Sequence, residues 1–239
     1  MKTSPITLEL IDFAGSDLAI VNAARVSFHK ESDWEYDIKH DGRCNERLSE
    51  KDQKLITYLA KHNHWSPFAH SFLSFRGKAP IFLARQLVKH SVGGMWNEVS
   101  RRYVDEEPEF YFPTSWRGRA DNAKQGSDGV FDAKFFVDGN KETMDVHATN
   151  LCYAAVQLYN QAVHNGMAPE QARMILPQNT MTEWIWSGSL AFFARVYKER
   201  SNPGAQKEAQ EFAAMLSKLI PQEYEHSWKA LTTTHEERV

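Results

Sequence analysis

The stretch from Ala84 to Tyr103 most constrains how this chain can fold, because it joins a helix signal to a glycine pair and a dense group of cations. Pro80 favours a first helical turn, and apolar residues then recur at helical spacing, at Ile81, Ala84, Leu87 and Val88. The alternating segment 70–78 before it predicts a strand. Gly93 and Gly94 predict an end to regular structure and a close approach of the backbone to a ligand. A rigid scaffold would thus present the cations on a loop.

The polar side chains of this stretch suit an anionic ligand. Arg85 and Lys89 lie four residues apart and share one helix face, with Gln86 beside them. Acceptors, a hydroxyl and two guanidinium groups follow the glycine pair, at Asn97, Glu98, Ser100, Arg101 and Arg102. Fixed cations with N–H and O–H donors are what a phosphate monoester or pyrophosphate requires. A basic helix end followed by a solvated loop has the same pattern, so the residues alone leave both interpretations open.

Size, charge and cysteine content exclude several classes of protein. The 239 residues, 42% of them hydrophobic, can bury one sizeable core, and a formal net charge of −3 gives no general attraction for nucleic acid. No apolar run is long enough to cross a membrane, and the amino end lacks a signal-peptide apolar region, which predicts a cytoplasmic protein. Cys44 and Cys152 are too isolated for a disulfide framework or a zinc site. Cys152, in an apolar helical segment, is expected to be an inert core residue.

The remaining segments predict one α+β domain over residues 1–239, with an antiparallel or mixed sheet flanked by long helices. Strand signals occur at 6–11, and Ser49 with Asp52 resembles a capping box that starts a helix. Further helices are expected toward residues 23–24, over 141–165, near 169, over 182–199 and around 212. Residues 29–48 are expected to form a loop, and 114–140 a flexible excursion. In the helix over 141–165, the predicted apolar side is Met144, Leu151, Ala155, Leu158 and Ala162.

The stretch from Ala84 to Tyr103 resembles the signature of the flavin-dependent thymidylate synthases, the ThyX family. Its outer pattern, Arg-Gln…Asn-Glu-x-Ser-x-Arg-Tyr, is intact. At the centre, Lys89-His90-Ser91 replaces Arg-His-Arg, and eight residues instead of seven separate Ser91 from Ser100, so a planar guanidinium fork is lost. Four other blocks match in order: 23–28, 64–70, 172–177, and Arg200 followed by Ala205-Gln206.

This resemblance implies a specific activity. The chain would convert dUMP to dTMP, with methylenetetrahydrofolate as carbon donor and NADPH-reduced FAD as hydride source. It would form a homotetramer whose active sites draw on more than one chain, and it would need no metal. Two alternatives remain open: an enzyme that leaves a hydroxymethyl group on the pyrimidine, and a nucleotide- or flavin-binding protein without turnover.

The resemblance also implies roles for individual residues. The nucleotide would contact seven side chains, chiefly through its phosphate, with Glu98 at the sugar: Gln86, Glu98, Ser100, Arg101, Arg102, Arg173 and Arg200. Arg200 would lie near the base and stabilise charge on the pyrimidine, while Ser100 would donate to the phosphate and not act as a nucleophile. FAD would contact His64, Ser66, Lys89, His90, Ser91, Asn97, Ser189 and Arg195. Ser189 and Arg195 stand where the family pattern has asparagines.

Overall fold

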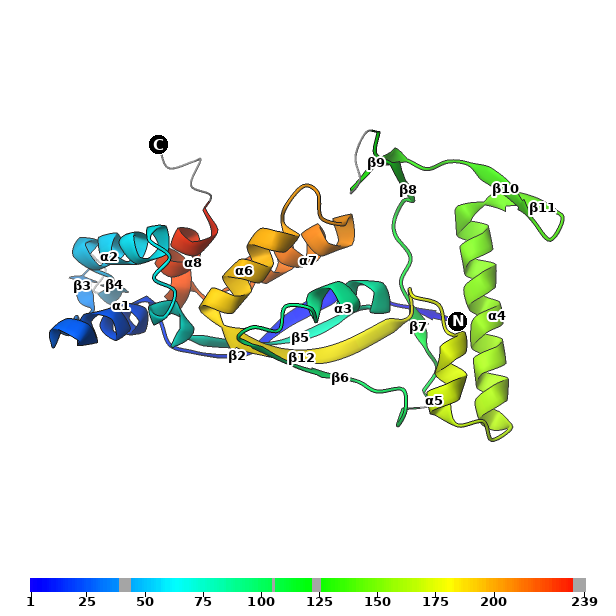
Figure 1. Cartoon of the computed structure of the whole chain (residues 1–239), viewed down its shortest axis with the longest axis horizontal. Coiled ribbons are helices and arrows are strands. Elements are labelled where there is room, and N and C mark those ends of the chain that lie inside the picture. Colours follow the sequence, from blue (N-terminus) through cyan, green and yellow to red (C-terminus); the bar gives the residue numbers. More distant parts are fainter. Residues whose placement is uncertain (39–43, 105, 122–125, 234–239) are drawn as a thin grey trace.

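A four-stranded antiparallel sheet runs along the long axis of the molecule (Figure 1). The computed structural model describes residues 1–38, 44–104, 106–121 and 126–233. In sheet order the strands are β2 (Thr7–Ala14), β5 (Phe72–Pro80), β12 (Met181–Ser189) and β6 (Gly94–Glu98). The expected α+β architecture with an antiparallel sheet is confirmed.

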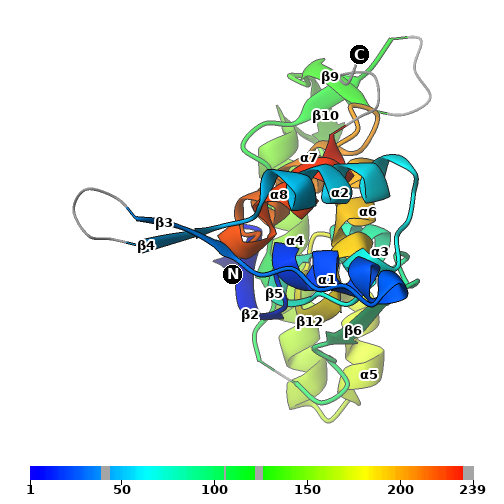
Figure 2. The ribbon, with the colours of Figure 1, turned by 90° about the vertical axis from the view of Figure 1, so that its left-hand side faces the viewer.

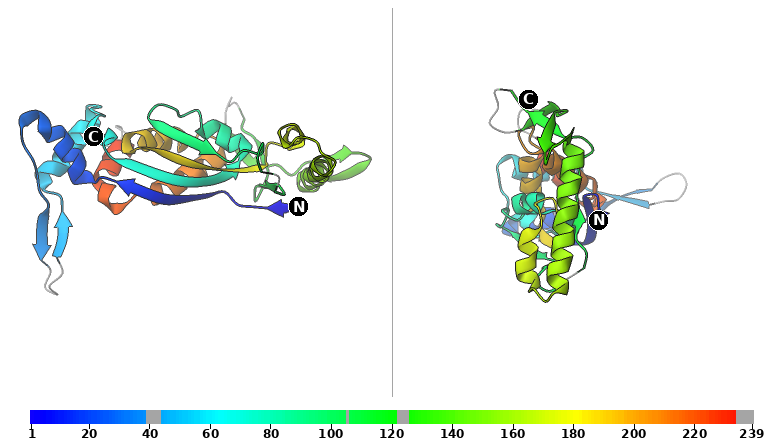
Figure 3. Two further views of the ribbon diagram at one scale, coloured as in Figure 1. Left: turned by 90° about the horizontal axis from the view of Figure 1, so that it is seen from below. Right: turned by 90° about the vertical axis from the view of Figure 1, so that its right-hand side faces the viewer.

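One face of this sheet carries the core. Leu73 and Phe75 of β5 are buried while Phe72 and Arg76 are exposed, so the predicted alternation holds. The helices that cover the buried face are α3 (Ile81–Leu87), α6 (Leu190–Arg200) and α7 (Lys207–Lys218) (Figure 1). Seen from below, the opposite face of the sheet lies in front of these helices (Figure 3).

The segment 182–199, expected to be one long helix, is instead strand β12 followed by helix α6. Trp184 and Trp186 are buried at a spacing of two, which is the period of a strand. Ser189 ends the strand and caps the helix, because its hydroxyl accepts a hydrogen bond from the N–H of Phe192 at 3.2 Å. The aromatic residues of both elements enter one core, which is why their composition alone resembles a single apolar helix.

The glycine pair also serves a different purpose from the one expected. Gly94 begins strand β6 and does not end regular structure. A Cβ atom on Gly94 would lie 2.3 Å from the ring of Phe192, so the missing side chain lets β6 pack against α6. Gly93 has a φ of 87°, a conformation that favours glycine. The close approach is therefore to the core of the protein.

One end of the sheet is covered by α1 (Asp17–Arg25), α2 (Glu50–Lys61) and α8 (Glu225–Thr232), with the short helices η1 (Val26–Phe28), η2 (Pro67–Ala69) and η4 (Gln222–Tyr224). The predicted N-cap is confirmed: the N–H of Asp52 donates to the Ser49 hydroxyl at 3.1 Å, and that hydroxyl donates to the Asp52 carboxylate at 2.7 Å. The expected loop over 29–48 contains β3 (Glu35–Ile38) and β4 (Cys44–Arg47), which form a projecting hairpin (Figure 2). Residues 39–43 between them lie outside the described residues.

Helix α4 (Met144–His164) lies at the other end of the sheet with α5 (Pro169–Ala172) and η3 (Arg173–Ile175) (Figure 1). Its buried face is only partly the predicted one: Ala155 is buried as expected, but Leu151 and Leu158 are 65% and 53% exposed, whereas their neighbours Cys152 and Tyr159 are buried. The face of a helix cannot be chosen without its packing partner, and here the phase was misjudged by about one residue.

Short strand pairs complete the described part of the chain. β1 (Lys2–Thr3) pairs in parallel with β7 (Glu109–Phe110). The segment 114–140 contains β8 (Arg117–Arg119), β9 (Ser127–Val130) and β10 (Lys134–Val137), and β11 (Asn140–Thr143) begins at its end. β8 pairs with β9, and β10 with β11. Among the described residues, no helix combines the length and the apolar character that crossing a membrane requires.

Candidate functional site

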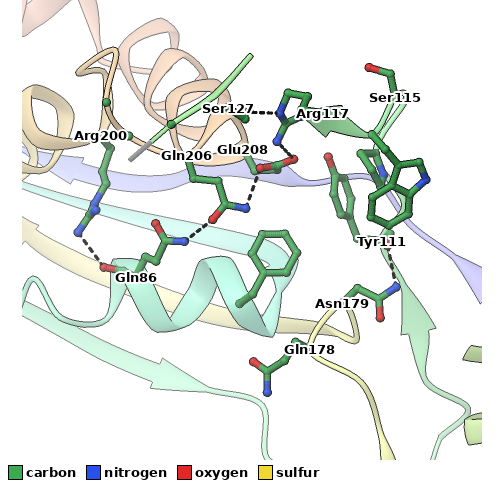
Figure 4. A pocket seen from close by; sticks show the side chains of 16 residues that line it. Gln86, Tyr111, Ser115, Arg117, Ser127, Gln178, Asn179, Arg200, Gln206 and Glu208 are labelled. Carbon is green, nitrogen blue, oxygen red and sulfur yellow. Dashed lines mark hydrogen bonds and ion pairs between the residues drawn. The ribbon is translucent and has the colours of Figure 1, made fainter. Parts of the chain in front are cut away.

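A pocket of about 780 Å³ lies between α3, the loop after α6 and the segment that leads into β8. We call it the base pocket. Two of the predicted nucleotide-binding residues, Gln86 and Arg200, line it. Its other walls come from residues distant in sequence, among them Phe82, Tyr111, Trp116, Arg117, Gln178, Asn179, Gln206 and Glu208 (Figure 4).

Arg200 is fixed at the end of α6 by two hydrogen bonds. Its Nε donates to Nε2 of His90 at 2.9 Å, and its terminal nitrogen donates to the backbone carbonyl of Gln86 at 3.1 Å. Burial lowers the pKa of His90, and the charge of Arg200 lowers it further, while Glu199 acts in the opposite direction. A neutral His90 can accept from Arg200, so the remaining guanidinium donors keep a defined direction.

A chain of hydrogen bonds connects Gln86 to the segment 114–140. The Gln86 amide donates to the Gln206 carbonyl oxygen at 2.6 Å, and the Gln206 amide donates to Glu208 at 2.9 Å. Arg117 of β8 forms an ion pair with the other oxygen of Glu208 at 2.6 Å, and its Nε donates to Ser127 at 2.9 Å (Figure 4).

The sequence did not predict a role for Glu208 or Arg117. Glu208 lies two residues after Gln206, which belongs to a block that matches the family pattern. This closeness to the block was the only sequence signal for a role of Glu208 in the site. Arg117 lies 91 residues away from Glu208 in sequence, and no sequence pattern indicates that the two residues meet.

Tyr111 presents a half-buried phenol to the base pocket. Burial raises the pKa of Tyr111 to about 12, and the nearby Glu208 and Glu211 add to the increase. The phenol therefore stays protonated at neutral pH and can donate a hydrogen bond. Its ring meets that of Phe82 edge to face, with 6.2 Å between centroids.

A second pocket, of about 280 Å³, lies at the β6 edge of the sheet, and we call it the acid-lined pocket. Three predicted nucleotide-binding residues line it: Glu98, Arg101 and Arg173. Glu98 accepts from the indole N–H of Trp96 at 3.0 Å and from the hydroxyl of Thr182 at 2.7 Å. Lys78 and further glutamates complete the lining, namely Glu106, Glu107, Glu109 and Glu183.

A single chain does not gather the predicted nucleotide contacts in one place. Gln86 and Arg200 line the base pocket. Glu98, Arg101 and Arg173 line the acid-lined pocket. Ser100 and Arg102 line neither pocket. The Ser100 hydroxyl accepts from the N–H of Arg102 at 3.3 Å, and the Arg102 guanidinium lies 3.6 Å from Glu170.

Comparison with known proteins identifies the family. Residues 9–224 match the family described as thymidylate synthase complementing protein. The chain belongs to this family. The flavin-dependent thymidylate synthase of Thermosipho africanus is 30% identical over 93% of this chain and 89% of its own length. That of Thermus thermophilus is 33% identical over 93% of this chain and 74% of its own.

A solved structure supports the same assignment. The crystal structure of a UMP/dUMP methylase, PolB from Streptomyces cacaoi bound with 5-Br dUMP, superposes with a TM-score of 0.73 at 28% identity and covers 97% of both chains. The same methylase bound with 5-Br UMP gives a TM-score of 0.72 at 26% identity over 97% of this chain and 96% of that one. The ThyX-like fold is thus confirmed along almost the whole chain.

The register of the sheet brings most of the predicted flavin contacts of this family member to one end. Gly94 pairs with Gly188, and Ser189 pairs with Phe72, so 64–71 and 91–94 both border that end. The side chains of Ser66, Lys89, Ser91 and Asn97 are exposed and make no hydrogen bond to the described part of the chain. Hydroxyl, amide and ammonium donors without internal partners fit the oxygens and phosphates of FAD.

Three predicted flavin contacts are already engaged within the chain. Ser189 is buried and caps α6, so its hydroxyl is directed to the backbone of that helix. Arg195 donates to the carbonyl of Val92, and His90 accepts from Arg200. His64 remains exposed, with its ring beside that of Tyr58.

The buried thiol of this family member does not suit a nucleophile. Cys152 is buried, as expected, and burial raises the pKa of its thiol, which disfavours the nucleophilic thiolate. The side chain of Cys44 lies outside the described residues. Over the described residues, no three histidine, cysteine or acidic side chains group in a way that could hold a metal ion.

Proposed function

We propose that this chain is a flavin-dependent thymidylate synthase that methylates dUMP at C5 to give dTMP. FAD is the cofactor, methylenetetrahydrofolate supplies the carbon, and NADPH supplies the reducing equivalents. The observation that carries the proposal is Arg200, a guanidinium held by two hydrogen bonds in the wall of the base pocket of a Thy1-family chain. When bound, reduced FAD supplies the hydride that completes the methyl group.

Arg200 stabilises the pyrimidine as C5 becomes nucleophilic. Negative charge then develops on the ring oxygens, and a fixed cation lowers the energy of that state without having to reorient. His90 holds the guanidinium in place by accepting from its Nε. Because the side-chain amide of Gln86 and the hydroxyl of Tyr111 line the same pocket, water is replaced around the ring by fixed dipoles.

The acid-lined pocket supplies the contacts for the rest of the nucleotide. Arg101 and Arg173 are the cations for the phosphate, and Ser100 and Arg102 adjoin Arg101 in the chain. Glu98, held by Trp96 and Thr182, accepts from a sugar hydroxyl. Lys89, Ser91, Asn97, His64 and Ser66 hold FAD. We leave Ser189 out of the flavin contacts, because its buried hydroxyl caps α6, and keep Arg195, whose exposed guanidinium has donors besides the one that meets the Val92 carbonyl.

We infer a homotetramer whose active sites combine chains. The proposed contacts to one small nucleotide are divided between two pockets of a single chain, so a site assembled from two chains reunites them. Apolar side chains that such contacts would cover are exposed on the free face of the sheet and on α4, namely Ile11, Met95, Leu151 and Leu158.

Complementation tests the shared site directly. Arg200→Ala and Arg173→Ala each remove one half of it, so each variant alone loses activity. If the site combines chains, coexpressing the two variants restores part of the activity, because some mixed sites are intact. If coexpression restores nothing while sedimentation detects mixed oligomers, each site lies within one chain.

The reaction itself is tested by the visible spectrum of the purified protein and the mass of its product. A flavin spectrum that NADPH bleaches, with a product roughly 14 mass units heavier than dUMP, is the expected result, since CH2 is gained. A hydroxymethyl product or no product would support the two alternatives. UMP is the second substrate to test, because the methylase with the similar structure is described as acting on UMP and dUMP. The cytoplasmic location remains a prediction.

A further inference from the structure

The hydrogen-bond chain behind Gln86 has a fixed polarity. The Glu208 carboxylate bears only acceptors, so the Gln206 atom that faces it at 2.9 Å must be the amide nitrogen. The Gln206 carbonyl oxygen then faces Gln86 and accepts from its amide nitrogen at 2.6 Å. The Gln86 carbonyl oxygen is left as the free acceptor, directed away from Gln206 (Figure 4).

The origin of this polarity lies inside the protein. Glu208 is only 3% exposed, and Arg117 forms an ion pair with its second oxygen. Ser127 in turn accepts from Nε of Arg117. A glutamine at a pocket wall can normally rotate its amide by half a turn and exchange donor for acceptor. Here the buried Glu208 carboxylate prevents this exchange at Gln86, because it fixes the Gln206 amide that lies between them.

Arg200 places donors beside this acceptor. Its guanidinium donates to the backbone carbonyl of Gln86, so both residues form one part of the wall of the base pocket (Figure 4). An acceptor next to donors matches a uracil ring, which presents an N–H between two carbonyl oxygens. Cytosine presents a ring nitrogen acceptor and an amino donor. Its acceptor would therefore face the Gln86 oxygen, and its amino group would face the donors of Arg200.

We propose that Glu208, acting through Gln206, fixes the Gln86 amide so that the base pocket accepts a ring N–H and selects uracil over cytosine nucleotides. The proposal rests on the proposed function, because it requires a pyrimidine nucleotide in this pocket. It moves Gln86 from the phosphate, its expected ligand, to the base. Arg101 and Arg173, the phosphate contacts, lie in the other pocket, and the Gln86 amide nitrogen already donates to Gln206.

The test is the ratio of the affinities for dUMP and dCMP, measured by calorimetry on the full-length protein. Glu208→Gln keeps the shape of the side chain but lets the Gln206 amide face it with either its nitrogen or its oxygen. Gln206→Met removes the hydrogen bonds between Glu208 and Gln86 without changing the charge. We expect each change to lower the dUMP preference about tenfold, the cost of one mismatched buried hydrogen bond. Gln206 is exposed, so its substitution leaves the fold intact even if the buried Glu208 variant is unstable.

A matched control separates polarity from stability. Gly94→Ala lowers stability by crowding the Phe192 ring, away from the base pocket, and leaves the hydrogen bonds from Glu208 through Gln206 to Gln86 in place, so we expect a lower melting temperature and an unchanged dUMP preference. An equal loss of preference in Gly94→Ala would make the effect of the Glu208 and Gln206 variants one of stability and overturn the proposal. Unchanged preference in both Glu208→Gln and Gln206→Met would overturn it and leave the proposed function standing. A wild-type protein that binds no dUMP would overturn both.

Discussion

Replacing Arg200 by alanine should separate catalysis from nucleotide binding. The wild-type guanidinium is held by His90 at 2.9 Å and by the Gln86 carbonyl at 3.1 Å, so its free donors are oriented before the reaction begins. Loss of one such donor to a developing charge lowers kcat by about 10² to 10³, or about 2.7 to 4 kcal/mol. In the ground state the same charged donor meets an uncharged carbonyl, where a hydrogen bond contributes about 1.5 to 3 kcal/mol.

The assay therefore measures two quantities on the same variant. Single-turnover release of tritium from C5-labelled dUMP reports the chemical step, and calorimetry reports the affinity for dUMP. We expect a loss of about a hundredfold to a thousandfold in the first and a smaller loss, of about tenfold to a hundredfold, in the second. Lys198→Ala, which removes a cation from an exposed position of the same helix, should change neither. Equal losses in rate and affinity would refute the charge-stabilising role.

Two further predictions concern the surroundings of Arg200 and the packing of the sheet. The pKa of His90 is lowered in the folded protein, so His90 is neutral and accepts from Arg200 at neutral pH. Protonation of His90 in acid removes this acceptor. Turnover should therefore fall as the pH drops through the lowered pKa, which lies below the ordinary value of 6.5. His90→Gln, which cannot titrate, should lose this acid limb, and an identical limb in the variant would contradict the assignment. Gly94→Ala should lower the free energy of unfolding by about 1 to 3 kcal/mol, because its Cβ would lie 2.3 Å from the Phe192 ring. Chemical denaturation measures this difference, and an unchanged midpoint would show that the ring can move aside freely.

The sequence predicted correctly the elements that depend on interactions between residues close to each other in the chain. The Ser49 cap fixes the start of α2 through a hydrogen bond from Asp52, three residues away. The alternation in β5 follows from burial of one face alone. The segment 182–199 was misassigned because two tryptophans at a spacing of two and two phenylalanines further on suit either period until the sheet is known. Leu151 was misplaced because the buried side of α4 depends on what packs against it.

The candidate site was predictable only where the residues resemble a family. Gln86 and Arg200 were named from such blocks, and the structure places both in one pocket. The carboxylate of Glu208 and its partner Arg117 meet across 91 residues of sequence, and no pattern in either segment indicates the other. The division of the expected nucleotide contacts between two pockets is likewise a property of the folded chain.

Strand β12 acts as a spacer of set length between the two ends of the sheet. Thr182 near its start supports Glu98 in the acid-lined pocket, and Ser189 at its end starts α6 beside the segments proposed to hold the flavin. Nine residues at about 3.3 Å each make this strand about 30 Å long. Inserting or deleting one residue would reverse which face its side chains occupy and change the separation of the two ends. Sequence change in β12 is therefore restricted to substitution.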